Sequence, residues 1–146
     1  GGLVKWRDEK AIRAVTDRYI DELKIKCTSS KQKAKELSGG NQQKVCLAKA
    51  FALEPNFLFV SEPTRGIDVG AKYDIYCIIA EMAKQGKSII MISSEMSEII
   101  GMSNRVMVMC DGRITGFIDG KDATQENIMA LATQYETAPE AAAAKQ

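Results

Sequence analysis

The feature that most constrains this fold is a run of four apolar residues that ends abruptly in polar ones. Phe57 to Val60 are followed directly by Ser61, Glu62 and Pro63. A short apolar run bounded by turn residues predicts a strand that is buried on both faces. Open α/β sheets place their chemistry at the carboxyl ends of such strands, so Glu62 is a candidate catalytic residue.

The rest of the chain alternates helical and extended patterns around this strand. Helices are expected over Trp6 to about Lys24, Gly39 to about Leu53, Val69 to Lys84, Ser94 to Ile100 (with Ser94 as N-cap) and Thr124 to about Tyr135. Further strands are expected over Lys87–Ile92, Arg105–Cys110 and Arg113–Ile118, the last two forming a hairpin around Asp111-Gly112. In the third helix the period turns Tyr73, Tyr76, Ile79 and Ala83 inward. The pattern predicts an α/β fold with a mixed sheet flanked by helices.

Composition excludes several classes of function. The 146 residues, 45% of them hydrophobic, are enough for one core, and the net charge of +1 gives no support for a nucleic-acid-binding surface or a polybasic membrane anchor. The apolar runs fall well short of the ~20 residues that span a bilayer. No signal peptide is recognised, and the chain opens on Gly1-Gly2 rather than Met, so we expect it to be a piece of a longer protein.

The cysteines predict no metal site. There are four of them, widely spaced and without a CxxC pair, and the chain has no histidine. A zinc site would need all four thiolates from scattered positions. Cys46, Cys77 and Cys110 lie among apolar residues, so we expect them to be small buried hydrophobic side chains in a reducing cytosol.

The second informative stretch is LSGGNQQKV, from Leu37 to Val45. Ser38, Gly39 and Gly40 stand where a helix begins, and free N–H groups together with the helix dipole favour an anion there. Two glycines allow a ligand to approach the backbone closely. By itself, however, this tripeptide is more often an ordinary serine N-cap that follows a flexible loop.

One motif is absent. The sequence contains no GxxxxGK[ST] loop and no GxGxxG. If the protein handles nucleotide phosphates, its main phosphate cradle lies outside these residues.

Taken together, these stretches resemble the ATPases of ABC transporters. LSGGNQQ, a hydrophobic strand, then EPTRGID and a helix are similar to the signature, the Walker B strand and the D-loop of that family. The longer match, with EPTRGIDVGAK and SSEM, resembles the second of two fused ATPase domains in bacterial importers of ribose, galactose and xylose. The resemblance covers about Ile25 to Tyr135 and implies the C-terminal half of a P-loop NTPase domain.

The resemblance implies roles for individual residues. Ser38, Gly39 and Gly40 would contact the γ-phosphate of an ATP bound to a partner domain. Gln43 and Asn41 belong to the same motif, although they fit equally well as first-turn helix residues. By the same resemblance, Glu62 would polarise the attacking water, and Asp68 would be the D-loop acid that reaches across the dimer, or the N-cap of the helix that starts at Val69, or both. A bulky residue at Gly40 is then expected to block the phosphate with little effect on folding.

Two positions depart from the family pattern. Where the family has an aspartate that supports Mg²⁺, this chain has Ser61, which carries no charge. Where the family usually has a histidine that contacts the γ-phosphate, this chain has Ser94, and serine is usual at that position in the sugar-importer branch. Both departures put hydrolysis at this domain's own site in doubt.

The resemblance also implies a setting. Residues 1–36 would be the end of a helical subdomain with a linker, residues 37–135 the signature helix and later strands, and residues 136–146 a flexible tail. ATP and Mg²⁺ are expected only in the complete subunit, and the chain alone is expected to be inactive. The expected partners are transmembrane permease subunits and a second, fused ATPase domain, at the cytoplasmic face of the plasma membrane, with no nucleic acid. Two alternatives stay open: a non-catalytic half that only supplies its signature, and a soluble ABC ATPase acting on nucleic acid or the ribosome.

Overall fold

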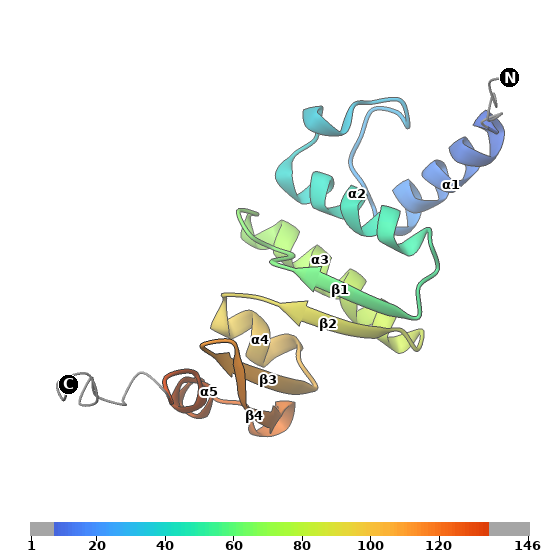
Figure 1. Cartoon of the computed structure of the whole chain (residues 1–146). Helices are drawn as coiled ribbons and strands as arrows, with labels where there is room; N and C mark the ends of the chain where they lie inside the picture. Colours follow the sequence, from blue (N-terminus) through green and yellow to red (C-terminus); the bar gives the residue numbers. More distant parts are fainter. Residues whose placement is uncertain (1–7, 135–146) are drawn as a thin grey trace, which may run out of the picture. The chain divides into compact units, whose positions relative to one another are not determined.

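A computed structural model describes residues 8–134, over which helices alternate with short strands (Figure 1). The elements are α1 (Glu9–Glu22), η1 (Ala34–Glu36), α2 (Gly39–Phe51), β1 (Phe57–Ser61), α3 (Val69–Lys84), β2 (Ser88–Ile92), α4 (Met96–Met102), β3 (Arg105–Cys110), β4 (Arg113–Asp119), η2 (Gly120–Asp122) and α5 (Gln125–Ala132). This alternation confirms the α/β class. Trp6 and the expected tail from Glu136 lie outside the described residues. No helix within residues 8–134 is both long and apolar enough to cross a bilayer.

The chain divides into two compact units, residues 1–90 and 91–146. In the first unit, α2 packs against α3. The core of this unit is apolar and combines side chains from α1, the segment directly after it, α2, β1 and α3, namely Tyr19, Leu23, Ile25, Leu47, Ala48, Phe51, Val60, Ile75, Ile79 and Met82. Cys46 and Cys77, which were expected to be buried, are exposed, whereas Cys110 is buried as expected.

Side-chain caps set where the three long helices begin. The carboxylate of Asp8 accepts hydrogen bonds from the N–H groups of Lys10 and Ala11, both at 3.0 Å, at the start of α1. Ser38 caps α2, and Asp68 caps α3. Each cap supplies an acceptor to N–H groups that have no partner inside the helix. Helix α3 therefore begins at Val69, as predicted, and it also ends at Lys84 as predicted.

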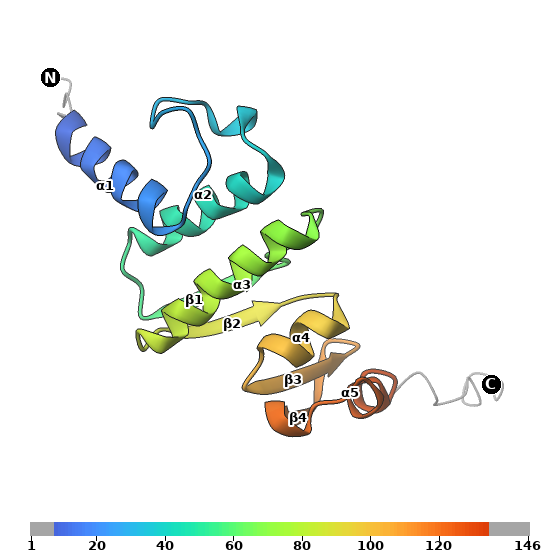
Figure 2. The same cartoon turned by 180° about the vertical axis from the view of Figure 1, so that it is seen from behind.

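Strand β1 differs from the expectation of burial on both faces. Val60 is buried, but Phe57 is 49% exposed and Phe59 is 66% exposed. Successive side chains of a strand point to opposite faces, and α3 covers one face of β1, as Figure 2 shows from behind. The opposite face carries Phe57 and Phe59, and within the described residues it is covered less than the face that packs on α3. An apolar run therefore identified the strand correctly but not its surroundings.

The strands form two separate pairs within the described residues. β1 pairs with β2, and β3 pairs with β4. The β1 and β2 arrows point the same way in Figure 1, with α3 as the connection between them, whereas β3 and β4 are antiparallel. The expected single mixed sheet is thus present as one parallel and one antiparallel pair, because each of these strands has only one hydrogen-bonded neighbour here.

The second unit is built on the hairpin. Asp111 and Gly112 have φ angles of +49° and +73°, the left-handed conformation that a two-residue hairpin turn requires. This confirms the Asp-Gly prediction. Val106 and Val108 point from β3 into a core that Ala123 and Ile128 complete.

Two details of the helices differ from expectation. Helix α4 begins at Met96 with Glu95, not Ser94, as its N-cap. Just before the helix, the hydroxyl of Ser93 accepts a hydrogen bond from the Glu95 N–H at 3.0 Å. In α3 the buried face carries Ile75, Ile79 and Met82, while Tyr73 is 68% exposed. The predicted period was right for Ile79, but Tyr73 and Ala83, which it also turned inward, are exposed.

Candidate functional site

The candidate site begins at the N-terminus of α2, where three predicted residues follow one another. Ser38 has extended backbone angles (φ −61°, ψ 157°) and is the N-cap. Its hydroxyl oxygen accepts from the side-chain Nδ2 of Asn41 at 2.8 Å and from the Asn41 N–H at 3.5 Å. Ser38 and Gly39 are exposed, so a ligand can reach both.

The next residue, Gly40, is buried and has a second reason to be glycine. A Cβ atom placed on Gly40 would lie 2.6 Å from the Cβ of Ala71 and 3.3 Å from the Cγ2 of Ile67. The missing side chain therefore lets α2 approach α3. This overturns the expectation that a bulky residue at Gly40 would have little effect on folding, because such a residue cannot fit between the helices.

Gly39 is different from its neighbour. A Cβ atom at Gly39 would meet only the carbonyl oxygen of Gly66, at an ordinary contact distance of 3.9 Å. This contact also places the turn after β1 beside the start of α2.

The first turn of α2 has the chemistry of an anion site. The first hydrogen bond that closes the helix runs from the Gln42 N–H to the Ser38 carbonyl, at 2.8 Å. Among the described residues, no acceptor bonds to the N–H of Gly39 or Gly40. Two unbonded N–H groups at the positive end of a helix dipole, next to a serine hydroxyl, can hold a phosphate oxygen.

The turn after β1 carries Glu62 in an unusual conformation. Its φ is +48°, in the left-handed region that residues other than glycine adopt rarely. The next two residues, Pro63 and Thr64, are among the most deeply buried in the chain and hold this turn in place. Ser61 is exposed at the end of β1, and Glu62 is partly exposed. Residues with such rarely populated backbone angles are common at functional sites, and this one holds a carboxylate at the end of a strand.

Asp68 ends the same turn. Its Oδ1 accepts from the Ala71 N–H at 3.0 Å, which confirms the N-cap prediction for this residue. Gln43 lies further along α2 and is partly exposed. Ser94 is exposed and belongs to the other compact unit.

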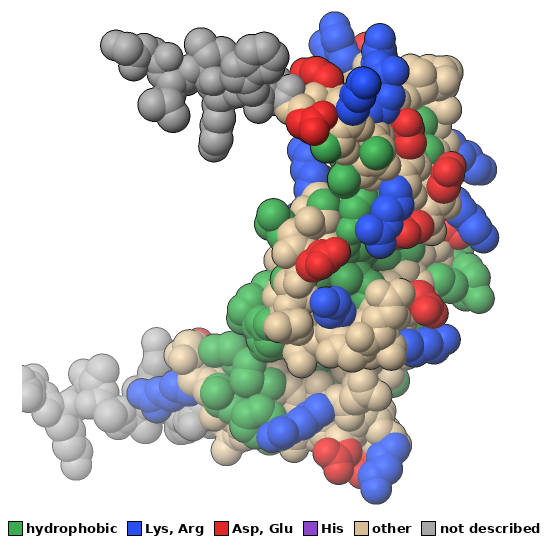
Figure 3. All heavy atoms as spheres, turned by 90° about the vertical axis from the view of Figure 1, so that its right-hand side faces the viewer, with side chains coloured by type: hydrophobic (Ala, Val, Ile, Leu, Met, Phe, Trp, Pro, Cys, Tyr) green, Lys and Arg blue, Asp and Glu red, His purple; other side chains and the backbone are tan. Residues whose placement is uncertain are grey.

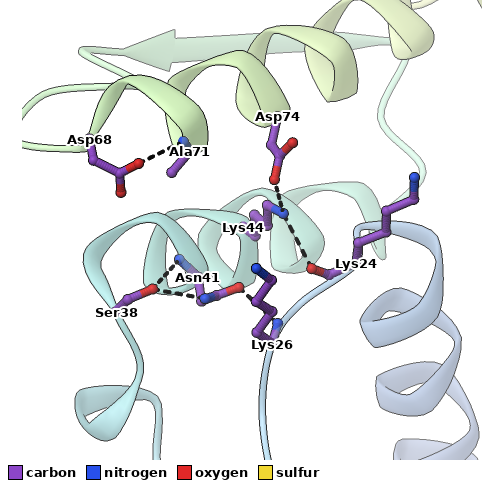
Figure 4. A network of polar contacts seen from close by, with 8 residues as sticks. All are labelled: Lys24, Lys26, Ser38, Asn41, Lys44, Asp68, Ala71 and Asp74. Atoms are coloured by element: carbon purple, nitrogen blue, oxygen red, sulfur yellow. Dashed lines mark hydrogen bonds and ion pairs between the residues drawn. The ribbon is translucent and has the colours of Figure 1, made fainter.

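A buried lysine joins the helices around the site, and sequence reasoning missed it (Figure 4). The Lys44 side chain is 5% exposed, and its Nζ donates to Asp74 Oδ2 at 2.8 Å and to the Lys24 carbonyl at 3.2 Å. It thus joins α2 to α3 and to the end of α1. Helical spacing contained a signal, since residue 44 shares a face with Gly40, Leu47 and Phe51, but a lysine on that face was not anticipated.

The hydrogen bond from Lys44 holds the pKa of Asp74 below its ordinary value, with a smaller contribution from the lysine charges nearby. Burial opposes this shift. Asp74 is therefore an anionic partner for Lys44 at neutral pH.

The described residues do not form a magnesium site by themselves. No group of three histidine, cysteine, aspartate or glutamate side chains within residues 8–134 is arranged to hold a metal ion. At the end of β1 the chain offers one carboxylate, on Glu62, beside the neutral hydroxyl of Ser61. Hard cations such as Mg²⁺ need more oxygen ligands than these.

Comparison with known proteins places these features in a family. Residues 5–65 match the family model described as ABC transporter. The galactose/methyl galactoside import ATP-binding protein of Clostridium tetani is 54% identical over 140 residues, which are 92% of this chain and 28% of that protein. The L-arabinose transport ATP-binding protein of Geobacillus stearothermophilus is 54% identical over 127 residues, 87% of this chain and 25% of that protein. The xylose import ATP-binding protein of Moorella thermoacetica is 55% identical over 115 residues, 79% and 23% respectively.

Solved structures show the same fold. A nucleotide-free ATP-binding cassette from an ABC transporter superposes with a TM-score of 0.74 at 22% identity, covering 87% of this chain and 50% of the cassette. An inward-facing, metal-chelate type ABC transporter gives a TM-score of 0.73 at 16% identity, covering 92% and 52%.

The chain thus spans about a quarter of the curated relatives it matches and about half of the solved cassettes. Residues 5–65 thus match the ABC-transporter family, and the chain has the fold of part of an ATP-binding cassette.

Proposed function

We propose that this chain is part of the ATP-binding subunit of a carbohydrate ABC importer, and that the complete subunit couples ATP hydrolysis to sugar uptake. The observation that carries this proposal is the 50–55% identity to proteins named for import of galactose, ribose, arabinose and xylose, over most of the chain. These names favour an importer over a soluble ATPase that acts on nucleic acid or the ribosome.

In this proposal the start of α2 binds phosphate in trans. The hydroxyl of Ser38 and the N–H groups of Gly39 and Gly40 contact the γ-phosphate of an ATP held by a second cassette, with Gln43 in the same motif. Such donors stabilise the negative charge that spreads over the phosphate oxygens during transfer. Asp68, besides capping α3, faces the partner cassette across this interface.

The carboxylate of Glu62 acts at the chain's own nucleotide site. It positions the attacking water and accepts its proton. The strained turn and the buried Pro63-Thr64 pair hold this carboxylate at the end of β1. ATP and Mg²⁺ belong to the complete subunit, because the phosphate loop and enough metal ligands lie outside this chain.

The proposed partners follow from the same assignment. The cassette would work with transmembrane permease subunits and a second ATPase domain fused to it, at the cytoplasmic face of the membrane. In this arrangement residues 1–36 form the end of a helical subdomain, and residues 37–135 carry the signature and the later strands. On the face seen in Figure 3, basic and acidic side chains are interspersed, and we expect no nucleic-acid partner.

A second candidate is a non-catalytic half that only supplies its signature to the partner's ATP. Two uncharged residues favour this candidate. Ser61 stands where the family has an aspartate that supports the metal, and Ser94 stands where it usually has a histidine that contacts the γ-phosphate. The two candidates differ only in whether Glu62 acts on an ATP bound at this chain's own nucleotide site.

The test uses a complete subunit, made by replacing the matching segment of the Clostridium tetani relative with this chain. Ser38→Ala should lower ATP turnover and sugar uptake roughly tenfold, since it removes one hydrogen bond to a charged group. Glu62→Gln should lower turnover further if this half is catalytic, and should leave it unchanged if this half is not. Gly101→Ala, at an open position of α4, is the control. Turnover at the parental rate in both Ser38→Ala and Glu62→Gln would contradict the proposal.

A further inference from the structure

The side chain of Asn41 is held between two partners that fix its orientation. Its Oδ1 accepts from the backbone N–H of Lys26 at 2.8 Å, and its Nδ2 donates to the Ser38 hydroxyl oxygen at 2.8 Å (Figure 4). A backbone N–H can only donate, so the amide oxygen must face Lys26. The amino group is thereby directed at Ser38.

This arrangement decides what the Ser38 hydroxyl can do. A hydroxyl has one hydrogen to donate and can accept two hydrogen bonds. Since the oxygen accepts from Asn41, the hydroxyl hydrogen is left to point away from the helix, toward solvent. The backbone N–H of Asn41 lies at 3.5 Å from the same oxygen, so the side-chain amide is the closer donor.

The Lys26 end of the contact is anchored firmly. Lys24 has a φ of +50°, and its carbonyl accepts from the buried Lys44 at 3.2 Å. Ile25, between Lys24 and Lys26, is buried at 7% exposure. The segment that orients Asn41 is therefore hydrogen-bonded to α2 at both ends, through Lys24 and Lys26, and its middle residue is buried.

We propose that Asn41 is a positioning residue, which keeps the Ser38 hydroxyl poised as a donor to a phosphate oxygen. This inference rests on the proposed function of Ser38. In it, Asn41 touches no nucleotide and acts only through Ser38. It assigns a role to the residue after the two glycines that goes beyond its place in the first helical turn.

A double-mutant cycle in the complete chimeric subunit tests the inference through ATP turnover. Asn41→Ala and Ser38→Ala should each lower the rate about tenfold, and the double variant should also be about tenfold slower, not a hundredfold. Gln42→Ala is the matched control: its Nε2 donates to the Leu37 carbonyl at 2.8 Å in the same turn, and its effect should add to that of Ser38→Ala. Additive losses for Asn41 and Ser38, or a parental rate in Asn41→Ala, would overturn the inference while leaving the proposed function intact. A parental rate in Ser38→Ala would overturn both.

A second pair of variants separates the donor from the anchor. Asn41→Asp keeps an acceptor for the Lys26 N–H but removes the donor, so the Ser38 hydrogen must turn inward to the carboxylate. Turnover should fall at least as far as in Asn41→Ala, while exchange of the Lys26 amide hydrogen stays slow. Gln42→Asp adds the same charge one residue away and should cost much less. Parental turnover in Asn41→Asp would show that the bond to the Lys26 N–H matters and the donor to Ser38 does not. An equal loss in Gln42→Asp would show that the added charge causes the loss. Either outcome would overturn the inference.

Discussion

At the scale of single residues, the adjacent glycines of the site have different reasons to lack a side chain. Gly40 faces Ala71 across the α2/α3 contact, whereas Gly39 is exposed and has no close neighbour except Gly66. Only Gly39 is therefore suited to testing access of a phosphate. A substitution at Gly40 changes helix packing and access together.

The two glycines should respond differently to alanine. We expect Gly40→Ala to destabilise the chain by about 1–3 kcal/mol, because overpacking outweighs the gain in helix propensity of about 1 kcal/mol. Gly39→Ala should change stability by less than about 1 kcal/mol. Urea unfolding of both variants measures this difference, and adding Ala71→Gly to Gly40→Ala should recover part of the loss. Equal stabilities for the two alanine variants would contradict the packing explanation.

The Lys44–Asp74 ion pair predicts a loss of stability in acid. The pKa of Asp74 is lower in the folded chain than in the unfolded chain, since Lys44 donates to it. The pair's contribution is therefore complete above the ordinary aspartate pKa of about 3.9 and is lost as the pH falls through the lower pKa of the folded state. Asp74→Asn should flatten this acid limb and lower stability at neutral pH, because Lys44 stays buried without a counter-charge. Urea midpoints between pH 2.5 and 7 measure it, with exposed Asp17→Asn as control.

Several residues of the site could be predicted from the sequence, and others could not. Ser38 and Asp68 were predictable as caps because capping depends on the next three residues alone. Lys44 was not, since its partners Lys24 and Asp74 are 20 and 30 positions away. The role of Gly40 in helix packing was missed for the same reason.

At the scale of elements, the hairpin is the part whose structure follows most directly from local sequence. Gly112 must adopt a φ of +73° in the turn, while Gly101 lies in helix α4 with open space around it. We expect Gly112→Ala to destabilise the chain by about 1 kcal/mol and Gly101→Ala to stabilise it by up to about 1 kcal/mol. Thermal unfolding of the two variants gives the comparison. Opposite signs support the backbone argument, and a neutral Gly112→Ala would contradict it.

Element positions were predicted better than element surroundings. The bounds of α3 and the Asp-Gly turn are local properties and agree with the structure. The start of α4 was misplaced because Ser94 is a favoured capping residue, whereas the N-cap is Glu95, which makes no side-chain cap hydrogen bond. Burial of β1 was misjudged because the cover of a strand comes from distant parts of the chain, which no local pattern describes.

At the scale of the whole molecule, the chain spans about half the length of the solved cassettes it matches, and one face of β1 is exposed within the described residues. Phe57 and Phe59 lie on that face with their rings 5.0 Å apart, in edge-to-face contact. Both remain largely exposed although each could contribute about 1.5–3 kcal/mol when fully buried. The solved cassettes contain a further half that has no counterpart in this chain.

This exposed face should behave in opposite ways in the isolated chain and in the complete subunit. In the isolated chain, Phe59→Lys should leave stability nearly unchanged and reduce concentration-dependent self-association, because an exposed aromatic pair on a strand promotes contact between copies. In the complete chimeric subunit, where the remaining half of the cassette is available to cover β1, the same change should destabilise the fold by about 2 kcal/mol. Sedimentation and urea unfolding measure the two effects, with Tyr73→Lys on the exposed side of α3 as the matched control. If Phe59→Lys is neutral in the complete subunit, the face stays open there, and the apolar character of β1 has another cause.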